Sequence, residues 1–538
     1  MADHPKHNYT GLLGWVEDRF PLMETWNYHL AQYYAPRNFN IWYYFGSLAI
    51  LVLVFQIFSG LFLAFHYKPD AALAFNSVEY IMRDVPGGWF IRYMHSTGAS
   101  FFFIVVYLHM FRALIYGSYK GKRELLWLIG MTIYLALMAT AFMGYLLPWG
   151  QMSLWGAQVI INLFNTIPFI GEQLSVWLRG DFVLSDATLN RFFALHFFIP
   201  VIVLPALVFV HMVALHAVGS NNPDGIEIKQ GPKGNRWSPD APKDGIPFFP
   251  YYIVKDVFGV GVFLFVFFAV LFFAPEMGGF FLEPPNFEPA NALKTPLHIA
   301  PVWYFTPFYT ILRSIPDPWY GTVGMFSAII LLFLLPWIDK NPIKSWRYRN
   351  ASHMANLLLF AIVFLILGWM GTKSVEPLYK ELGTRMTQIY FLFFVVLGIH
   401  SRPFANSQPS NVLGILIAVV LGLLVWIGSG FLSFGGIFAG IVVGLAFALI
   451  FMLGNFIAKQ YFGKNGVKAR YAAWFFILLG LIIFYDVYFR FVPSDTTATV
   501  QMLLQLIWPV VYLGVTLLLP ALSPSVNAEK PVPERVTE

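Results

Sequence analysis

The sequence predicts an all-α integral membrane protein with about twelve transmembrane helices. Hydrophobic residues make up 58% of its 538 residues and charged residues only 12%, whereas a soluble protein carries about 25% charged residues. The apolar residues gather in runs close to the roughly 20 residues that a helix needs to cross a bilayer. Unpaired backbone groups are very costly in hydrocarbon, so these runs are expected to be helices.

The chain is expected to divide into four parts. They are an N-terminal cytoplasmic segment (1–41), a core of five spans (42–275), an outer loop with further helices (276–400), and additional transmembrane helices with a cytoplasmic tail (401–538). The individual spans are expected at residues 42–65, 90–116, 124–147, 192–217, 252–274, 322–338, 354–372, 386–400, 411–430, 434–455, 471–490 and 500–521.

Lys and Arg residues predict the orientation in the membrane. With the N-terminus in the cytoplasm, the segments on that side hold 23 of the 34 Lys and Arg residues, as the positive-inside rule requires. Both termini are then cytoplasmic, and the long loops 148–191 and 275–320 face outward, where long loops are usually functional. The net charge of +6 reflects this topology, so we expect no nucleic-acid partner.

The chain contains no cysteine. Disulfides, cysteine-ligated iron–sulfur clusters, thiolate zinc sites and haem c linked through a CxxCH motif are therefore excluded within this chain. Any such centre must lie on a partner subunit.

Four histidines stand in two pairs on two long apolar segments. His95 and His109 are 14 residues apart, and His196 and His211 are 15 apart. These steps span roughly 21–23 Å along a helix and return to nearly the same face. Because polar groups inside a membrane are costly and imidazole binds iron well, the spacing predicts a helical bundle in the N-terminal part that holds two stacked haems, each between two imidazoles.

Two pairs of glycines repeat the histidine spacing. A flat macrocycle needs the backbone to come close at its edge, and glycine permits this approach; close helix packing is the alternative explanation. The four glycines expected beside the cofactors are Gly46, Gly60, Gly130 and Gly144.

Two arginines lie one helical turn from a histidine on the same face. Arg92 precedes His95 by three residues, and Arg112 follows His109 by three. Haem propionates are anionic, so these cations are candidates to bind them. The alternative is ordinary charge that sets topology.

Several motifs resemble cytochrome b of the bc-type quinol–cytochrome c oxidoreductases, respiratory complex III. They are IRYMHSTGAS, GYLLPWGQMSLWGAQVIINLFNTIPFIG, RFFALHFFIP, HxxGSNNPDG and LRSIP, and the resemblance covers roughly residues 10–400. It implies two b haems. His95 and His196 would bind the low-potential haem near the outer side, and His109 and His211 would bind the high-potential haem near the cytoplasm.

The resemblance also implies an outer pocket for quinol oxidation. It would be built from PWGQMSLWG (148–156) and PVWY (301–304). Without the resemblance, the alternative interpretation is that these Pro, Trp and Tyr residues form an aromatic belt at the membrane interface. The residues implied here are Gly156, Pro301, Val302 and Trp303 for binding quinone, and Tyr304 and Tyr309 for catalysis.

One departure from the family pattern affects this pocket. The family commonly has glutamate at the second position of PVWY, where this chain has Val302, and valine cannot act as a general base. Glu283 and Glu288 are candidate replacements, with His298 as a third. For each of the two glutamates, a solvated loop carboxylate is the alternative interpretation, and the sequence alone favours it.

An inner pocket for quinone reduction is implied beside the second haem. His216 and Asp256 are expected to supply protons and Lys255 to help bind quinone, with Ser220 and Asn222 in secondary positions. A histidine and an aspartate can hydrogen-bond the two quinone carbonyls. Taken alone, Lys255 and Asp256 have the alternative interpretation of a charge pair at the membrane interface.

The 15-residue step from His196 to His211 is a second departure, because the bc-type pattern usually has 14. We expect a local helix distortion to absorb the extra residue, and Pro200 and Pro205 offer places for it. The b–f relatives, which share the longer step, also carry a haem tethered by a cysteine. The absence of cysteine excludes that haem here.

The implied protein is the catalytic subunit of a proton-translocating enzyme in the bacterial inner membrane. Its partners would be a Rieske iron–sulfur subunit, a cytochrome c-type subunit, membrane lipid and a second copy of the complex. Two alternatives are a dihaem anchor of a dehydrogenase and a transporter or channel. The spans after about residue 410 carry no histidine pair, so they are open to an extra subunit, an oxidase, lipid or simple packing.

Overall fold

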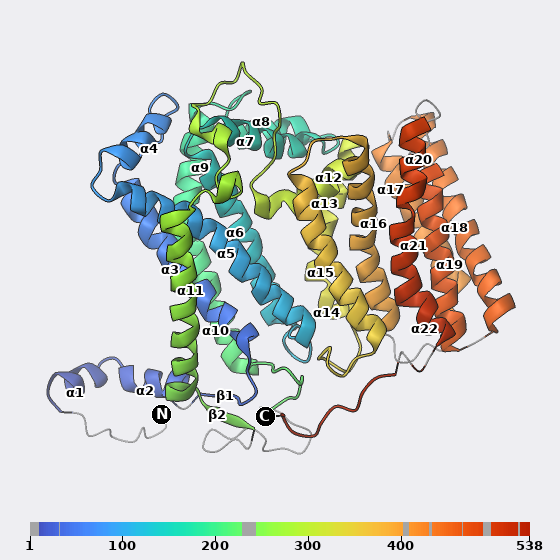
Figure 1. Cartoon of the computed structure of the whole chain (residues 1–538), viewed down its shortest axis with the longest axis horizontal. Coiled ribbons are helices and arrows are strands. Elements are labelled where there is room, and N and C mark those ends of the chain that lie inside the picture. The colour runs from blue at the N-terminus through green and yellow to red at the C-terminus, as the bar shows by residue number, and fades with distance from the viewer. Residues whose placement is uncertain are drawn as a thin grey trace.

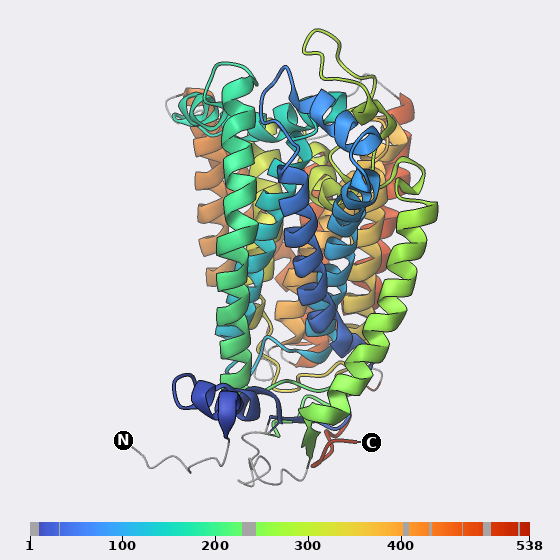
Figure 2. The same ribbon diagram turned by 90° about the vertical axis from the view of Figure 1, so that its left-hand side faces the viewer.

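The computed structural model describes residues 10–31, 33–228, 244–401, 408–429, 433–464, 466–487, 496–523, 525 and 528–537. Its helices stand side by side in one broad bundle (Figures 1 and 2). Large apolar side chains fill the interior; Phe103, Tyr134 and Leu367, from three different helices, are almost fully buried.

Eleven helices among the described residues are long and apolar enough to cross a membrane, and a shorter apolar helix lies at Pro318–Phe333. The predicted all-α membrane fold is therefore confirmed, with the sixth expected span shorter than the others. The eleven are Ile41–Ala64, Gly88–Tyr116, Glu124–Leu146, Asp186–Val218, Phe248–Phe273, Ala351–Gly371, Pro377–His400, Asn411–Gly428, Phe434–Phe462, Val467–Tyr485 and Thr499–Leu522.

The helices are labelled in chain order. Those up to residue 273 are α1 (Gly11–Glu17), α2 (Leu22–Trp26), α3 (Tyr44–Ala64), α4 (Ala74–Arg83), α5 (Gly88–Tyr116), α6 (Glu124–Leu146), α7 (Gln151–Asn165), α8 (Gly171–Arg179), α9 (Asp186–Phe198), α10 (Leu204–Val218) and α11 (Ile253–Phe273). The later ones are α12 (Thr306–Ser314), α13 (Pro318–Phe333), α14 (Leu335–Ile338), α15 (Ala351–Gly371), α16 (Pro377–His400), α17 (Asn411–Gly428), α18 (Phe434–Phe462), α19 (Val467–Tyr485), α20 (Thr496–Gln505), α21 (Ile507–Leu513) and α22 (Leu519–Leu522).

The first and last described segments lie at the same end of the bundle (Figure 2). There, β1 (Tyr34–Pro36) pairs antiparallel with β2 (Gly245–Pro247). Helices α7 and α8 cap the opposite end (Figure 1). This arrangement agrees with an even number of spans and with long loops on the side away from the termini.

A π-helical turn at Ile199–Val203 joins α9 to α10. It contains Pro200, and Pro205 is the second residue of α10, which follows it. A π turn holds one residue more than an α turn, so the 15-residue step from His196 to His211 covers the same axial distance as a 14-residue step in a regular helix. The expected local distortion is confirmed.

The C-terminal helices pack on α16 through a buried ion pair. Arg385 of α16 contacts Asp486, which follows α19, with 2.7 Å between Nη2 and Oδ2, and the two side chains are 0% and 4% exposed. Arg385 Nη2 also donates to the Met502 carbonyl oxygen of α20 at 2.9 Å. One guanidinium thus joins three helices.

Because each charge compensates the other, removing one partner is expected to cost more than removing both. Arg385→Leu or Asp486→Leu should each destabilise the fold by about 3–5 kcal/mol, since a lone buried charge is left. The double variant should be more stable than either single variant. The thermal unfolding midpoint in detergent measures this, and a double variant that loses the sum of the two single effects would contradict it.

Candidate functional site

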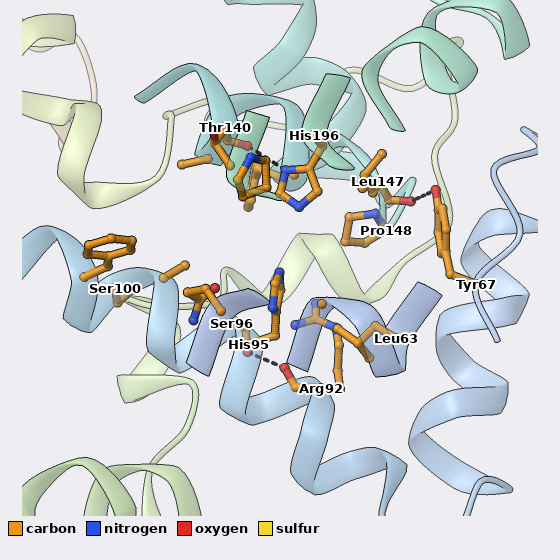
Figure 3. Close-up of a pocket in the computed structure, with 18 of the residues that line it drawn as sticks. Leu63, Tyr67, Arg92, His95, Ser96, Ser100, Thr140, Leu147, Pro148 and His196 are labelled. Atoms are coloured by element: carbon orange, nitrogen blue, oxygen red, sulfur yellow. Dashed lines mark hydrogen bonds between the residues drawn. The ribbon is translucent and has the colours of Figure 1, made fainter. Parts of the chain in front are cut away.

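His95 on α5 and His196 on α9 face each other across a cavity near the end of the bundle capped by α7 (Figure 3). Their ring centroids are 6.1 Å apart and their planes are inclined by 81°. A metal–imidazole bond of about 2 Å on each side would separate two opposed rings by about 6 Å. The spacing therefore fits a single metal ion between the two imidazoles.

The other ring nitrogen of each histidine is held by the protein. His95 Nδ1 lies 2.9 Å from Ser59 Oγ, and His196 Nδ1 donates to the Thr140 carbonyl oxygen at 2.8 Å. Metal-ligating histidines are commonly oriented in this way through the nitrogen that does not bind the metal. Neither Nε2 atom makes a hydrogen bond to the described part of the chain, so both are available to a ligand.

Each of the four glycines singled out by spacing lies against one of the four histidines. A Cβ atom added at Gly60 would lie 3.1 Å from His95 Cε1, and at Gly144 it would collide with the His196 ring. A side chain at these positions would displace the imidazoles. The four contacts are Gly46 with His109, Gly60 with His95, Gly130 with His211, and Gly144 with His196.

Both candidate arginines lie beside the histidines. Arg92 lines the same cavity as His95, and Arg112 Nη2 lies 3.1 Å from His109 Nδ1. Within the described residues neither arginine forms an ion pair with a carboxylate. A cation in a membrane interior needs an anionic partner, so both positions fit the carboxylates of a haem.

This cavity extends beyond the histidines. It has a volume of about 290 Å³, and its lining runs from Arg92, His95 and His196 to Val302 and Tyr304. The two segments that sequence reasoning assigned to different cofactors, the histidine helices and the PVWY segment, thus line one continuous space.

The PVWY segment is anchored against α5. Tyr304 stacks on Phe103 with ring centroids 3.9 Å apart, and Trp303 Nε1 donates to Ser100 Oγ at 3.0 Å. Pro301 and Val302 are buried. Tyr309 lies outside the cavity lining, and its hydroxyl donates to the Ile299 carbonyl oxygen at 3.4 Å.

Among the candidate acids, Glu283 is the one linked to the cavity, through a hydrogen bond to a residue of its lining. Its Oε2 accepts a hydrogen bond of 2.5 Å from Tyr145 Oη, and Tyr145 lines the cavity and packs near Gly156 of α7. Burial raises the pKa of Glu283 to about 7, against the opposing effect of this hydrogen bond. Glu288 and His298 are exposed, so the geometry favours Glu283.

The residues expected at the inner pocket gather at the opposite end of the bundle. His216, at the end of α10, lies 4.6 Å from Tyr33 and 5.2 Å from His29, measured between ring centroids. Tyr33 Oη lies 3.1 Å from Ser220 Oγ. The sequence offered no motif around His29 and Tyr33, so their contacts with His216 were not predicted.

Of the remaining residues expected at the inner pocket, Asp256 and Lys255 lie at the start of α11, and Asn222 lies in the loop after α10. Asp256, at the start of α11, interacts with the Ser47 hydroxyl of α3, and Lys255 is exposed with Nζ 5.3 Å from the Tyr252 ring centre. The Asn222 amide is occupied inside its own loop, since Nδ2 donates to the Ile226 carbonyl oxygen at 2.6 Å. Asn222 therefore shapes the loop.

Comparisons with known proteins agree with this geometry. The family described as Cytochrome b/b6/petB matches residues 30–219, and Cytochrome b(C-terminal)/b6/petD matches residues 289–391.

Individual relatives cover the same part of the chain. Cytochrome b of Allochromatium vinosum is 63% identical over 394 residues, which are 72% of this chain and 95% of that protein. Cytochrome b of Rhodospirillum rubrum is 49% identical over 397 residues, 74% of this chain and 94% of that protein. A chain of a solved hyperthermophilic respiratory complex III aligns with a TM-score of 0.67 at 39% identity, covering 72% of this chain and 98% of that one. By family, relatives and fold, the chain belongs to the cytochrome b family.

Proposed function

We propose that this cytochrome b oxidises quinol at an outer site, passes electrons across the membrane through two bis-histidine b haems, and reduces quinone at an inner site. His95 with His196 would hold the low-potential haem, and His109 with His211 the high-potential haem. When bound, the haems supply one-electron carriers, while the protein supplies position and electrostatics.

The observation that carries this proposal is the continuous cavity that joins His95 and His196 to Val302 and Tyr304. A quinol held against the PVWY segment would lie next to the first haem, with no helix between them. A simple dihaem anchor has no need for a second ligand space at this position, and a transporter has no need for opposed imidazoles.

Proton removal at the outer site is assigned to Glu283. A carboxylate with a pKa near 7 is a suitable general base at neutral pH, and the hydrogen bond from Tyr145 orients it beside the cavity. The apolar, buried side chain of Val302 excludes water from the wall where the family commonly has its acid. Glu283, beside Tyr145 of the lining, would thus accept the proton of quinol in place of an acid at position 302.

At the inner site, His216 and Asp256 would deliver protons to quinone. Tyr33 and His29 lie against His216 and limit the orientations of its ring. Ser220 and Lys255 would complete the binding site at its rim.

The wider assignments are also proposals. The chain would be the catalytic subunit of a proton-translocating complex in the bacterial inner membrane, with both termini cytoplasmic. A Rieske subunit and a cytochrome c-type subunit would supply the cysteine-bound centres that this chain lacks. The four-part division 1–41, 42–275, 276–400 and 401–538 would then separate the cytoplasmic segment, the dihaem core, the outer-site region and the extension.

The glycine contacts lead to a test of the haem assignment. Gly144→Val should displace the His196 ring and lower the haem b content from two to about one per chain, because only one of the four ligand positions is blocked. Gly261→Val on α11, where nothing lies within 4 Å of an added Cβ, is the matched control. Pyridine haemochrome spectra of the purified variants give the content; two haems in Gly144→Val would refute the assignment.

The outer-site base is tested by pH dependence. Since the pKa of Glu283 is raised to about 7, the carboxylate becomes able to accept a proton only as pH rises through that value. Quinol oxidation should increase up to about pH 7 and then level off. Glu283→Gln should lower the rate of quinol oxidation by about a hundredfold and abolish its rise with pH. Glu288→Gln, at an exposed position, should change neither the rate nor its pH dependence.

Tyr145→Phe provides a second readout at the same site. The tyrosine hydrogen bond lowers the pKa of Glu283, so its loss should move the midpoint of the pH profile upward while the step persists. Wild-type rate and pH profile in Glu283→Gln would exclude this residue as the base.

A further inference from the structure

The described C-terminal segment, residues 528–537, leaves the extension and runs beneath the core to the region of β2 (Figure 1). We name it the C-terminal strap. The matched family domains end at residue 391, so the strap lies far outside them. Its contacts are nevertheless with residues that precede α15 in the chain, at the end of the bundle where β1 and β2 pair.

The strap ends on a buried carboxylate. Asp224 Oδ2 accepts hydrogen bonds from the Thr537 backbone N–H at 2.8 Å and from its Oγ1 at 2.7 Å. The same carboxylate accepts from Asn38 Nδ2 and from Tyr348 Oη, both at 2.8 Å, and pairs with Arg347 at 3.1 Å. Asp224 thus ties the strap to three other parts of the chain.

Apolar contacts reinforce this attachment. Val536 is 2% exposed and packs with Ile226 and Ile228, which are 7% and 3% exposed. These three residues form a small cluster separate from the main core. Without the strap, both isoleucines would face water, so the loop that carries them would lose its apolar anchor.

The strap also reaches the other two segments around the proposed inner site. Arg37, in the N-terminal segment that carries Tyr33, donates through Nη2 to the Val536 carbonyl oxygen at 3.4 Å. Arg535 pairs with Asp244 at 3.0 Å, directly before β2 and the segment that leads to α11.

We propose that the C-terminal strap is a positioning element of the inner quinone site. By holding loop 219–228 against the N-terminal segment and the residue that precedes β2, it fixes Ser220 beside Tyr33 and keeps Tyr33 against His216 in the geometry that the proposed site needs. This inference rests on the proposed inner site, and it assigns the strap's residues no contact with quinone.

The ionisation of Asp224 supports this arrangement. Burial alone would raise the pKa of this carboxyl, but the hydrogen bonds from Thr537 and Tyr348 and the charge of Arg347 bring the pKa below its ordinary value. Asp224 is therefore anionic at neutral pH, the state in which it accepts all of these donors.

The test uses the complex purified with its partner subunits. One variant ends the chain after Arg535, a second is Val536→Asp, and the matched control is Val532→Asp, at a strap position that is 41% exposed. Hydrogen–deuterium exchange of residues 219–228 measures the order of the loop. The rate at which added ubiquinone-1 reoxidises reduced haem b under anaerobic conditions measures the activity of the inner site. The rate at which quinol first reduces haem b measures the activity of the outer site.

Faster exchange in residues 219–228 is expected for both strap variants, since the loop then opens locally. The ubiquinone-1 concentration for half-maximal reoxidation should rise by about tenfold, because a site whose residues are held less firmly must be ordered at the cost of binding free energy. Haem content and quinol-driven reduction should stay at the wild-type level, as should every property of Val532→Asp.

Unchanged exchange and unchanged quinone dependence in Val536→Asp would overturn the proposal, even if the shortened chain fails to assemble. Faster exchange with unchanged quinone dependence would overturn it as well, because the loop would then have lost its order without effect on the site. If the wild-type complex itself is not reoxidised by ubiquinone-1, the proposed inner site fails, which is a distinct result.

Discussion

The arrangement of this protein depends on four histidines on the membrane-spanning helices α5, α9 and α10, of which His95 and His196 face each other with ring centroids 6.1 Å apart. Buried polar groups in hydrocarbon are tolerated only with partners, and here the backbone is shaped around them: a glycine lies against each ring, and a π turn brings the longer helix into register with the shorter one. The cavity between His95 and His196 continues to the PVWY segment.

At the proposed outer site, the acid that accepts the quinol proton would come from a different place in the sequence than is common in the family. Val302 occupies the position where the family commonly has an acid, and it makes that wall of the cavity apolar. Glu283 lies in the preceding loop, and its hydrogen bond to Tyr145 brings it to the same cavity. The pKa near 7 then follows from burial, so the protein needs no acid at position 302 for the proposed proton transfer.

Sequence reasoning reached the parts of the structure that follow from local periodicity. The spans and the distortion near Pro200 were predicted from spacing, because helical geometry converts spacing directly into position. The pairing of His95 with His196 was implied by the family resemblance. The choice of Glu283 over Glu288, the contacts of His29 and Tyr33 with His216, and the strap at Asp224 were not predicted. These contacts join residues far apart in the chain, or residues in loops, and spacing carries no information about them.

The most direct test of the account is the number of b haems in the wild-type chain. A reduced-minus-oxidised optical spectrum, combined with iron quantified per chain, measures it. Two b haems per chain, resolved as two components in a redox titration, are predicted by the opposed histidine pairs. A chain that binds no haem, or only one, would contradict the assignment of these pairs and the route for electrons across the membrane.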